Sequence, residues 1–266
     1  MRKSMFSLEA VFKMDCAYLS TFTTKIDTSW GMLFYNENQP NYYDANHAYI
    51  QRTCEHPMSV IDEVTSFYQD KGMIPRFYLY NVEQLQTFIS VAKAKQYHYE
   101  EFNNPVQLWN HKVVEIETNS RVTIEKVTVD NYQEALEIEG SITEFGGMDT
   151  IKNIFQEQFN HTAFTHYLLR YEGIACSTAC IFVDDDQARL ESVATLEAYR
   201  GKGLIGALIQ FIQNEIIKRK IMHLWVFPIN ETIEKIYQKY GFQTVANLKN
   251  GHAYLEGKSI KEIQGG

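Results

Sequence analysis

The sequence predicts an α/β protein with a mixed central sheet, and three parts of the chain support this prediction. Residues 189–220 read as a strand, a turn with several glycines and an amphipathic helix. Residues 221–242 continue with a short apolar strand, ended by a proline, and a second helix that closes at a glycine. Residues 1–120 also alternate between helical and strand periodicity. Such alternation is typical of a sheet that carries helices on its faces.

The first part of the chain is poor in glycine and reads as alternating helices and strands. Only Gly31 and Gly72 fall within it, and Pro57 stands at the start of a predicted helix. The predicted helices are 9–23, 57–71 and 82–95, and the predicted strands are 30–35, 76–80, 97–102 and 106–109.

A polar stretch over residues 115–121 marks a boundary, so we predict two domains, 1–118 and 119–266. Before residue 189 the second domain alternates in the same way, and Glu172-Gly173 indicates a hairpin between two of its strands. Its predicted strands are 122–127, 164–171 and 174–183, and its predicted helices are 132–142 and 151–159.

Composition excludes several classes of protein. Hydrophobic residues make up 45% of the chain and aromatic residues 14%, which excludes global disorder. The formal net charge is −8, and basic residues form only short clusters such as 218–220, so we expect no nucleic-acid partner. No apolar run matches a signal peptide or a membrane span, so we expect a cytoplasmic protein without a membrane partner. Its oligomeric state stays open, a homodimer included.

The sequence predicts no metal site. Its four cysteines lack metal-ligand spacing, and Cys176 and Cys180 would lie about 13 Å apart along one strand, too far for a disulfide. They are therefore expected to be reduced thiols. Asp184, Asp185 and Asp186 are adjacent carboxylates without the alternate spacing of a calcium loop, so we interpret them as a hairpin turn.

Residues 200–206 have the features of an anion site. A helix N-terminus offers backbone N–H groups without intrahelical partners, and its dipole favours negative charge. Glycines allow a pyrophosphate to approach the backbone, and Arg200 and Lys202 add positive charge. An ordinary strand-to-helix turn that happens to carry glycines is the alternative.

Two motifs resemble the GNAT superfamily of acetyl-CoA-dependent N-acetyltransferases. The family's pyrophosphate loop reads Arg/Gln-x-x-Gly-x-Gly/Ala, and its next helix reads Asn-x6-Tyr followed by Gly-Phe. The first motif is matched by Arg200, Gly201, Lys202, Gly203 and Leu204, and the second by Asn230, Tyr237, Gly241 and Phe242. One position departs from the family pattern, because Ile205 stands where the loop ends in Gly or Ala and Gly206 follows one residue late.

The resemblance implies a GNAT fold for the second domain. The element order of the first part matches the later half of a GNAT domain, which implies a tandem protein with a degenerate GNAT-like first domain. That domain has Pro57-Met58 and no glycine at the equivalent loop, so it is not expected to hold acetyl-CoA. An unrelated α/β accessory domain is the alternative. Its aromatic residues Tyr42, Tyr43, His47 and Tyr49 would either line a substrate cleft or simply pack.

The resemblance also assigns coenzyme-binding residues. Residues 201–206 would bind the pyrophosphate of acetyl-CoA together with Arg200. The end of the preceding strand, Val193, Ala194 and Thr195, would pair with the pantetheine arm, and a backbone N–H near Ala194 would face the thioester oxygen. Asn230 would contact the coenzyme near the pantetheine, and it can also serve as an ordinary helix N-cap.

Tyr237 is the implied general acid, with an interior aromatic as its alternative role. Glu191, expected on the strand face shared by Val193 and Thr195, is the candidate base; a strand glutamate paired with Lys126 or Arg189 is the alternative. Glu144 and Asp149 lie where relatives place acceptor-binding residues.

The resemblance implies transfer of an acetyl group from acetyl-CoA to a primary amine of a small molecule, by direct attack in a ternary complex. A sensor or scaffold that binds acetyl-CoA without turnover, and a transferase with another acyl donor, are the alternatives.

Overall fold

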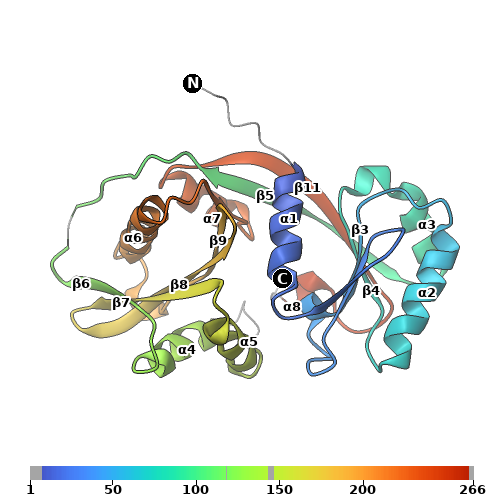
Figure 1. The fold of residues 1–266 in the computed structure, drawn as a ribbon, viewed down its shortest axis with the longest axis horizontal. Coiled ribbons are helices and arrows are strands. Elements are labelled where there is room, and N and C mark those ends of the chain that lie inside the picture. Colours follow the sequence, from blue (N-terminus) through green and yellow to red (C-terminus); the bar gives the residue numbers. More distant parts are fainter. Residues whose placement is uncertain (1–7, 118, 143–146, 264–266) are drawn as a thin grey trace. The chain divides into compact units, whose positions relative to one another are not determined.

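The computed structural model describes residues 8–117, 119–142 and 147–263, and the chain divides into two compact units (Figure 1). Unit 1 comprises Met1–Met14 and Pro105–Ala246, and unit 2 comprises Asp15–Asn104 and Asn247–Gly266. Neither unit is one continuous segment. Within the described residues, no helix combines the length and the apolar character needed to cross a membrane.

Two long strands explain why the units do not follow the predicted division at 118/119. β5 (His98–Trp109) begins in unit 2 and ends in unit 1, and β11 (Phe242–Tyr254) runs from unit 1 into unit 2. The last residues of β5 pair antiparallel with β10 (His223–Val226) of unit 1. The last residues of β11 pair antiparallel with β4 (Arg76–Leu79) of unit 2. Each unit therefore completes its sheet with a strand from a distant part of the chain.

Unit 1 is a mixed sheet with helices on both faces. Its strands lie in the order β6 (Val122–Lys126), β7 (Phe164–Tyr171), β8 (Ile174–Asp184), β9 (Gln187–Thr195), β10 and β5. Among the strand pairs of described register in unit 1, only β9 and β10 are parallel, and α6 (Leu204–Lys218) connects them. α6 packs on one face, and α4 (Tyr132–Gly140) and α5 (Met148–Asn160) pack on the other (Figure 1).

The two predicted hairpin turns of unit 1 contain residues with positive φ angles, as tight turns require. Glu172 and Gly173 have φ angles of 53° and 82° between β7 and β8, which suits a tight hairpin. Asp185, with φ 54°, and Asp186 form the turn between β8 and β9, and Asp184 is the last residue of β8, paired with Gln187. Among the described residues, no group of His, Cys, Asp and Glu could hold a metal ion.

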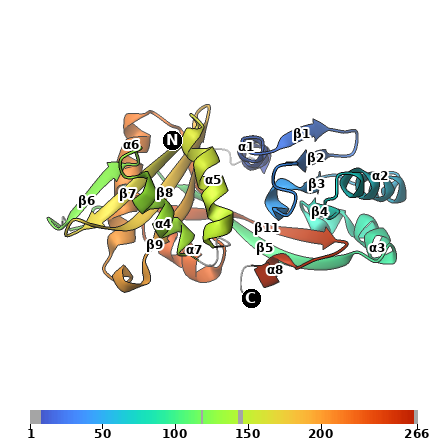
Figure 2. The ribbon, with the colours of Figure 1, turned by 90° about the horizontal axis from the view of Figure 1, so that it is seen from below.

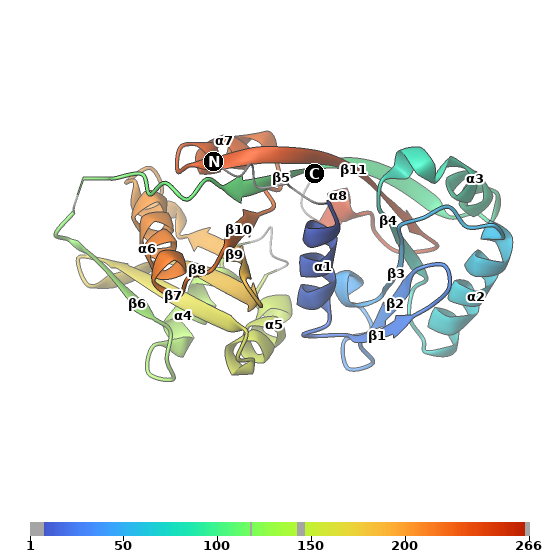
Figure 3. The same ribbon diagram turned by 45° about the horizontal axis from the view of Figure 1, so that its top comes forward.

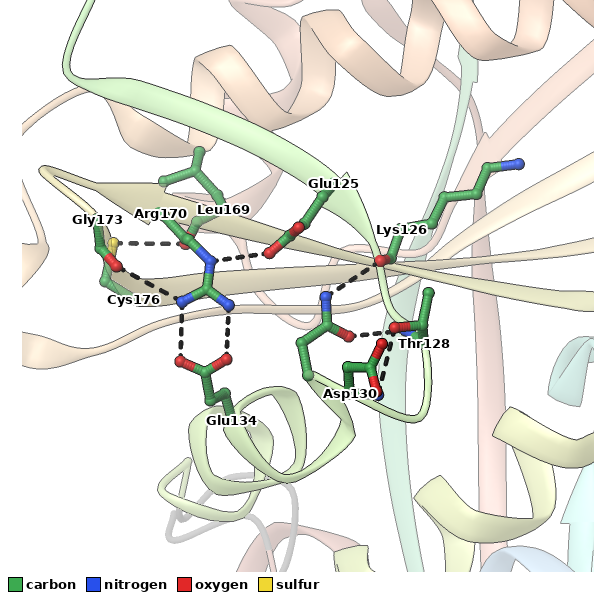
Figure 4. A network of polar contacts seen from close by, with 10 residues as sticks. Glu125, Lys126, Thr128, Asp130, Glu134, Leu169, Arg170, Gly173 and Cys176 are labelled. Atoms are coloured by element: carbon green, nitrogen blue, oxygen red, sulfur yellow. Dashed lines mark hydrogen bonds and ion pairs between the residues drawn. The ribbon is translucent and has the colours of Figure 1, made fainter.

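Arg170 of β7 holds α4 against the sheet edge (Figure 4). Its Nε donates to Glu125 of β6 at 2.8 Å, and its two terminal nitrogens donate to the two carboxylate oxygens of Glu134 on α4. This hydrogen bonding holds the pKa of the Glu134 carboxyl below its usual value. Asn131 precedes α4 and accepts from the backbone N–H of Thr128 at 2.7 Å, which fixes the chain entering the helix.

Unit 2 repeats the strand-helix-strand-helix-strand order of unit 1. β3 (His47–Ile50), α2 (Pro57–Asp70), β4, α3 (Gln86–Ala94) and β5 follow one another as β9, α6, β10, α7 (Glu231–Gln238) and β11 do. β3 and β4 are parallel, as β9 and β10 are. The sheet order is β1 (Thr24–Asp27), β2 (Met32–Tyr35), β3, β4 and β11, with β5 next to β11 (Figure 2).

The structure corrects several predicted elements of this part. β1 and β3 were not predicted, and the two predicted strands 97–102 and 106–109 are one strand, β5, which continues through the buried Pro105. α1 (Leu8–Leu19) ends earlier than predicted. The predicted helix 82–95 is a short 3-10 turn, η2 (Val82–Gln84), followed by α3. A second 3-10 turn, η1 (Tyr43–Ala45), precedes β3, and α8 (Ile260–Ile263) follows β11.

The two faces of the unit 2 sheet differ in chemistry. α2 and α3 lie on one face, over an apolar core that includes Ala48, Phe77 and Ala253 (Figure 3). The alternate positions carry polar and aromatic side chains, among them the buried His47, Arg76 and His252. His252 lies between Arg76, whose Nη1 is 3.1 Å from its Nε2, and Glu100, whose Oε1 is 2.8 Å from its Nδ1.

The two buried histidines of unit 2 predict a loss of stability in acid. Burial lowers the pKa of His47 to about 4, and burial lowers the pKa of His252 to about 4 against the opposing effect of Glu100. In the unfolded chain both histidines bind a proton near pH 6.5, whereas in the folded protein they bind it only near pH 4. The contribution of the neutral histidines to the unfolding free energy is therefore complete above pH 6.5 and is lost as the pH falls towards 4. Between pH 7.5 and 5.0, His47 alone should account for about 2 kcal/mol of the unfolding free energy.

Urea unfolding of the wild type and of His47→Phe at both pH values measures this contribution. The variant should lose about 2 kcal/mol less than the wild type between the two pH values. An equal pH dependence of the two proteins would contradict the assignment to His47.

Candidate functional site

The edge of β9 becomes open halfway along the strand. β9 pairs with β10 from Gln187 to Arg189, and the described register between the two strands ends there. On its other edge β9 pairs with β8 as far as Thr195. Among the described strands, none pairs with β9 on the β10 side beyond Arg189, so an extended ligand can lie against β9 there.

A bulge in β9 changes which side chains share a face. The register with β8 shifts between Thr178 and Cys180, and Ser192 has a φ of 49°. Glu191 lies opposite Cys180 and Ala194 lies opposite Thr178, so both point to the face covered by α4 and α5. The expectation that Glu191 shares a face with Thr195 is therefore wrong. An extra residue in the strand shifts the alternation, and the apolar pattern does not reveal it.

The turn after β9 exposes backbone donors at the start of α6. Gly201 and Gly203 have φ angles of 78° and 74°, and a Cβ atom at either would meet no described atom within 4 Å. Gly203 is the N-cap of α6, and the N–H of Gly206 donates to its carbonyl at 3.1 Å. In the described part of the chain, the backbone N–H groups of residues 201–205 donate to no acceptor. Consecutive free N–H groups at a helix N-terminus form an anion site.

Gly206, which follows the last position of the motif by one residue, has a packing role. A Cβ at Gly206 would lie 2.6 Å from the Tyr240 hydroxyl, so the glycine lets the Tyr240 ring pack against α6. The Tyr240 carbonyl accepts from Gln213 of the same helix at 2.7 Å. Ile205 is half-buried and packs with the apolar cluster under α6. The departure from the motif therefore leaves the turn at Gly201 and Gly203 open.

A cleft of 520 Å³ connects the open strand edge to this turn. Its volume lies in the range of small-molecule sites. Most of the predicted coenzyme-binding residues line it: Val193, Ala194, Thr195, Arg200, Gly201, Gly203, Leu204, Ile205 and Asn230. The sequence reasoning missed the remaining lining residues, which are Ile142, Tyr199, Ile229, Ile233, Ile236, Lys239 and Tyr240. In the sequence, Ile233, Ile236 and Tyr240 recur at helical spacing, and this spacing could have indicated that they form one wall of the cleft.

Two predicted coenzyme-binding residues, Gly206 and Lys202, do not line this cleft. The Lys202 ammonium lies 5.0 Å from the Tyr171 ring centroid and 4.9 Å from that of Tyr199. Lys202 and Arg121 help to line a separate hollow of 710 Å³, which shares Gly203, Leu204 and Tyr240 with the cleft. Arg200 is exposed, and its Nε donates to the Thr195 carbonyl at 3.2 Å, which ties the turn to the end of β9.

The residues of the second motif have well-defined positions on α7. Asn230 caps the helix, since its Oδ1 accepts from the Ile233 N–H at 2.9 Å. Tyr237 is buried in the last turn, with its ring 5.5 Å from that of Phe242. Burial and, secondarily, the charge of Glu191 raise the pKa of Tyr237. The phenol is therefore protonated at neutral pH, and it lies within electrostatic reach of Glu191.

Glu191 forms an ion pair with Arg189 of the same strand, and its side chain is 19% exposed. The Arg189 guanidinium also lies 4.6 Å from the Phe227 ring centroid. Arg189 was one of the two partners that the sequence suggested for Glu191.

A row of buried ionisable groups lies beside Glu191. His166 of β7 is opposite Cys180 of β8, which is opposite Glu191 of β9, so all three share one face of the sheet. His166 Nδ1 is 3.5 Å from Oε1 of Glu139 on α4, and both side chains are 2% exposed. Burial, with the charges of Glu139 and Glu191, raises the pKa of the Cys180 thiol well above its usual value. No sequence motif indicated this row, because its members are distant in the chain.

Asp149, one of the two predicted acceptor residues, does not line the cleft. Asp149 is exposed in the first turn of α5, and Glu144 lies outside the described residues.

Residues 131–242 match the sequence model of the acetyltransferase (GNAT) family. They therefore form a GNAT acetyltransferase domain. The match runs from the start of α4 to the start of β11 and includes the turn at 200–206, Asn230 and Tyr237. It confirms the resemblance seen in the two motifs. A comparison with curated proteins found no match.

Solved structures show that the fold around this GNAT domain is shared along nearly the whole chain. A conserved protein of unknown function from Staphylococcus epidermidis superposes with a TM-score of 0.75 at 11% identity, over 96% of this chain and 99% of its own. A GCN5-related N-acetyltransferase from Kribbella flavida gives 0.73 at 15% identity, over 97% and 99%. A tandem GNAT protein from the clavulanic acid biosynthesis pathway gives 0.54 at 9% identity, over 80% and 76%. The predicted GNAT fold is confirmed.

Gly206→Ala tests the packing of the GNAT domain around Tyr240. The added methyl group would displace the Tyr240 ring, so the unfolding free energy should fall by about 1–3 kcal/mol. Asn214→Ala, at an exposed position of the same helix, is the control and should change stability by less than about 0.5 kcal/mol. Urea unfolding measures both variants. Equal stability of Gly206→Ala and the wild type would show that the ring contact is not needed.

Proposed function

We propose that the protein transfers an acetyl group from acetyl-CoA to a primary amine of a small molecule. Membership of residues 131–242 in an acetyltransferase family supports acyl transfer in general. The observation that carries the proposal is the run of free backbone N–H groups at residues 201–205, at the start of α6 and within the cleft. These donors suit the diphosphate of the coenzyme.

The cleft fits the rest of the coenzyme. Positive φ at Gly201 and Gly203 and the open space beside them leave room for phosphate oxygens against the backbone. The pantetheine arm carries amides, and the edge of β9 beyond Arg189, along which no described strand pairs on the β10 side, offers N–H and C=O groups to them. The apolar wall of Ile229, Ile233 and Ile236 suits the methylene groups between them.

The proposed reaction is a direct transfer, in which Ala194 of the cleft acts together with Glu191 and Tyr237, two residues that do not line the cleft. The lone pair of the acceptor nitrogen attacks the thioester carbon, and the carbonyl oxygen becomes an oxyanion that accepts from a backbone N–H near Ala194. Collapse breaks the carbon–sulfur bond and expels the thiolate. Before the attack, Glu191 takes one proton from the acceptor ammonium, which frees the lone pair of the nitrogen. The nitrogen gives its second proton to solvent, and Tyr237 gives a proton to the thiolate and regains one from solvent, so the products are an amide and free coenzyme A.

A protein that binds acetyl-CoA without turnover is the second candidate. The ion pair between Arg189 and Glu191 favours it, because the proposed base is already engaged by a cation. The two candidates are separated by a direct experiment. Calorimetry with acetyl-CoA measures binding, and release of free thiol in the presence of an amine panel measures turnover. Binding without thiol release on any amine would favour the second candidate, and absence of binding would exclude both.

Tyr237→Phe should lower kcat and leave the binding of acetyl-CoA nearly unchanged. The substitution removes the proton donor and keeps the buried ring against Phe242, so we expect a loss of about 10²-fold or more. Tyr167→Phe, at another buried tyrosine of the same unit, is the matched control. Thiol-release kinetics at saturating acetyl-CoA measure both variants, and an unchanged kcat in Tyr237→Phe would refute the acid role.

Glu191→Gln should lower kcat/KM near neutral pH by about 10²-fold, with recovery towards high pH. The reason is that the acceptor amine must then lose its proton to solvent before it attacks. Glu197→Gln, an exposed glutamate next to the same turn, is the control. The pH–rate profile decides the question, since a uniform loss at every pH would indicate a structural role for Glu191.

A further inference from the structure

The face of the unit 2 sheet opposite α2 and α3 carries a cluster of aromatic side chains. Tyr49 of β3 lies directly opposite Tyr78 of β4 in the parallel register, so both side chains point to this face. His47 is two residues before Tyr49 on the same strand face, and Tyr80 follows the end of β4. We call His47, Tyr49, Tyr78 and Tyr80 the tyrosine face.

The rings of the tyrosine face contact one another. Tyr49 and Tyr78 are stacked, with centroids 5.8 Å apart and planes within 3° of parallel. Tyr49 also lies 6.0 Å from Tyr80, and His47 lies 5.7 Å from Tyr78. Tyr49 and His47 are buried behind the other rings, whereas Tyr78 and Tyr80 are half-buried and reach the surface. The negative faces of such rings attract cations.

A carboxylate lies next to these rings. The Tyr49 hydroxyl donates to the carboxylate of Asp15, in the second half of α1, at 3.4 Å, and Asp15 is half-buried. Burial and then the charge of Asp15 raise the pKa of Tyr80, which indicates that the carboxylate also lies near that ring. A carboxylate flanked by aromatic rings offers an ammonium group both an ion pair and cation–π contacts.

Charged groups of both signs lie around the tyrosine face. Asp44 and Glu100 act on Arg76, the guanidinium on the same face, and Arg76 also hydrogen-bonds the Lys258 carbonyl at 3.2 Å. The two buried histidines carry no charge near neutral pH, because the pKa of each is about 4. Nε2 of His47 has no hydrogen-bond partner among the described residues, and it is a further acceptor beside the rings. The named carboxylates thus outnumber the one guanidinium.

We propose that the tyrosine face and Asp15 form a binding site for the ammonium group of a small cationic molecule. The site discriminates a cation from a neutral molecule of the same shape, because Asp15 and the ring faces interact with its charge. This binding is independent of the proposed function. The matching class of ligand is a primary alkylammonium ion.

Hexylammonium chloride and 1-hexanol are the probes, since they differ in the ammonium group and share the alkyl chain. Calorimetry or NMR titration of the full chain without acetyl-CoA should show saturable binding of hexylammonium and at least about tenfold weaker binding of hexanol. Equal binding of the two probes, or no saturable binding of hexylammonium, would overturn the proposal.

Asp15→Asn removes the charge and keeps the shape of the side chain, so hexylammonium should bind about tenfold more weakly. Asp70→Asn, at an exposed position at the end of α2, is the matched control and should bind like the wild type. Tyr78→Leu is a second variant and should bind about three- to tenfold more weakly. Wild-type affinity in a folded Asp15→Asn or Tyr78→Leu protein would overturn the assignment of the site.

Affinity for acetyl-CoA separates this proposal from the proposed function. Asp15→Asn should bind acetyl-CoA as the wild type does, since Asp15 does not line the cleft at the start of α6. If the wild type binds hexylammonium but neither binds nor turns over acetyl-CoA, the cation site stands and the proposed function fails. If acetyl transfer occurs and hexylammonium does not bind, the proposed function stands and the cation site fails.

Discussion

The structure of the GNAT domain depends on the divergence of β9 from β10. The two strands pair only as far as Arg189, and β9 then continues along β8 alone. The bulge at Ser192 makes this possible, because an extra residue bends a strand and increases its twist. A non-glycine residue with positive φ is strained by about 1 kcal/mol. The regular pairs on both sides of the bulge hold it, so the strain is local and the resulting open edge is permanent.

The bulge also separates two sets of side chains in the site. Glu191 precedes the bulge, and its regular pairing opposite Cys180 places it on the face that carries Cys180, His166 and Glu139. The extra residue changes the face of the residues that follow, so Val193 packs with the apolar cluster under α6. A regular strand would place Val193 and Thr195 on the same face as Glu191.

A second constraint on the fold is that β5 and β11 each run from one unit into the other. Each of these strands contributes residues to both units, and each pairs with the central parallel strand of the unit in which it ends. Neither unit can complete its sheet from a contiguous segment, and the pairs that complete them join residues far apart in the chain. Such long-range pairing is slow to form, and it couples the folding of the two units.

Short sequence patterns predicted the turns and helix ends, because these features depend on residues close together in the chain. Gly173, Gly203 and Asn230 each satisfy a backbone requirement within a few residues, a positive φ or a helix cap, and the structure has the turn or helix end at each of them. The two motifs also identified the GNAT domain, because each consists of residues close together in the sequence. In contrast, the course of β5 and β11 between the units, the bulge at Ser192 and the row Glu139–His166–Cys180 depend on pairing between distant segments. Neither periodicity nor spacing contains that information.

The coupling between Tyr237 and Glu191 bears on the order of proton transfers in the proposed reaction. A phenol is a weaker acid than a thiol by about 1.5 pKa units in water, and burial makes Tyr237 weaker still. Part of this effect comes from the negative charge of Glu191, which opposes formation of a phenolate. Once Glu191 has accepted the proton of the acceptor nitrogen it is neutral, and that opposition disappears. Burial also disfavours the thiolate, so the thiolate leaving into the cleft is a stronger base than it is in water. Tyr237 is therefore best suited to donate its proton after Glu191 has been protonated, and the electrostatics of the pair favour a base-first sequence.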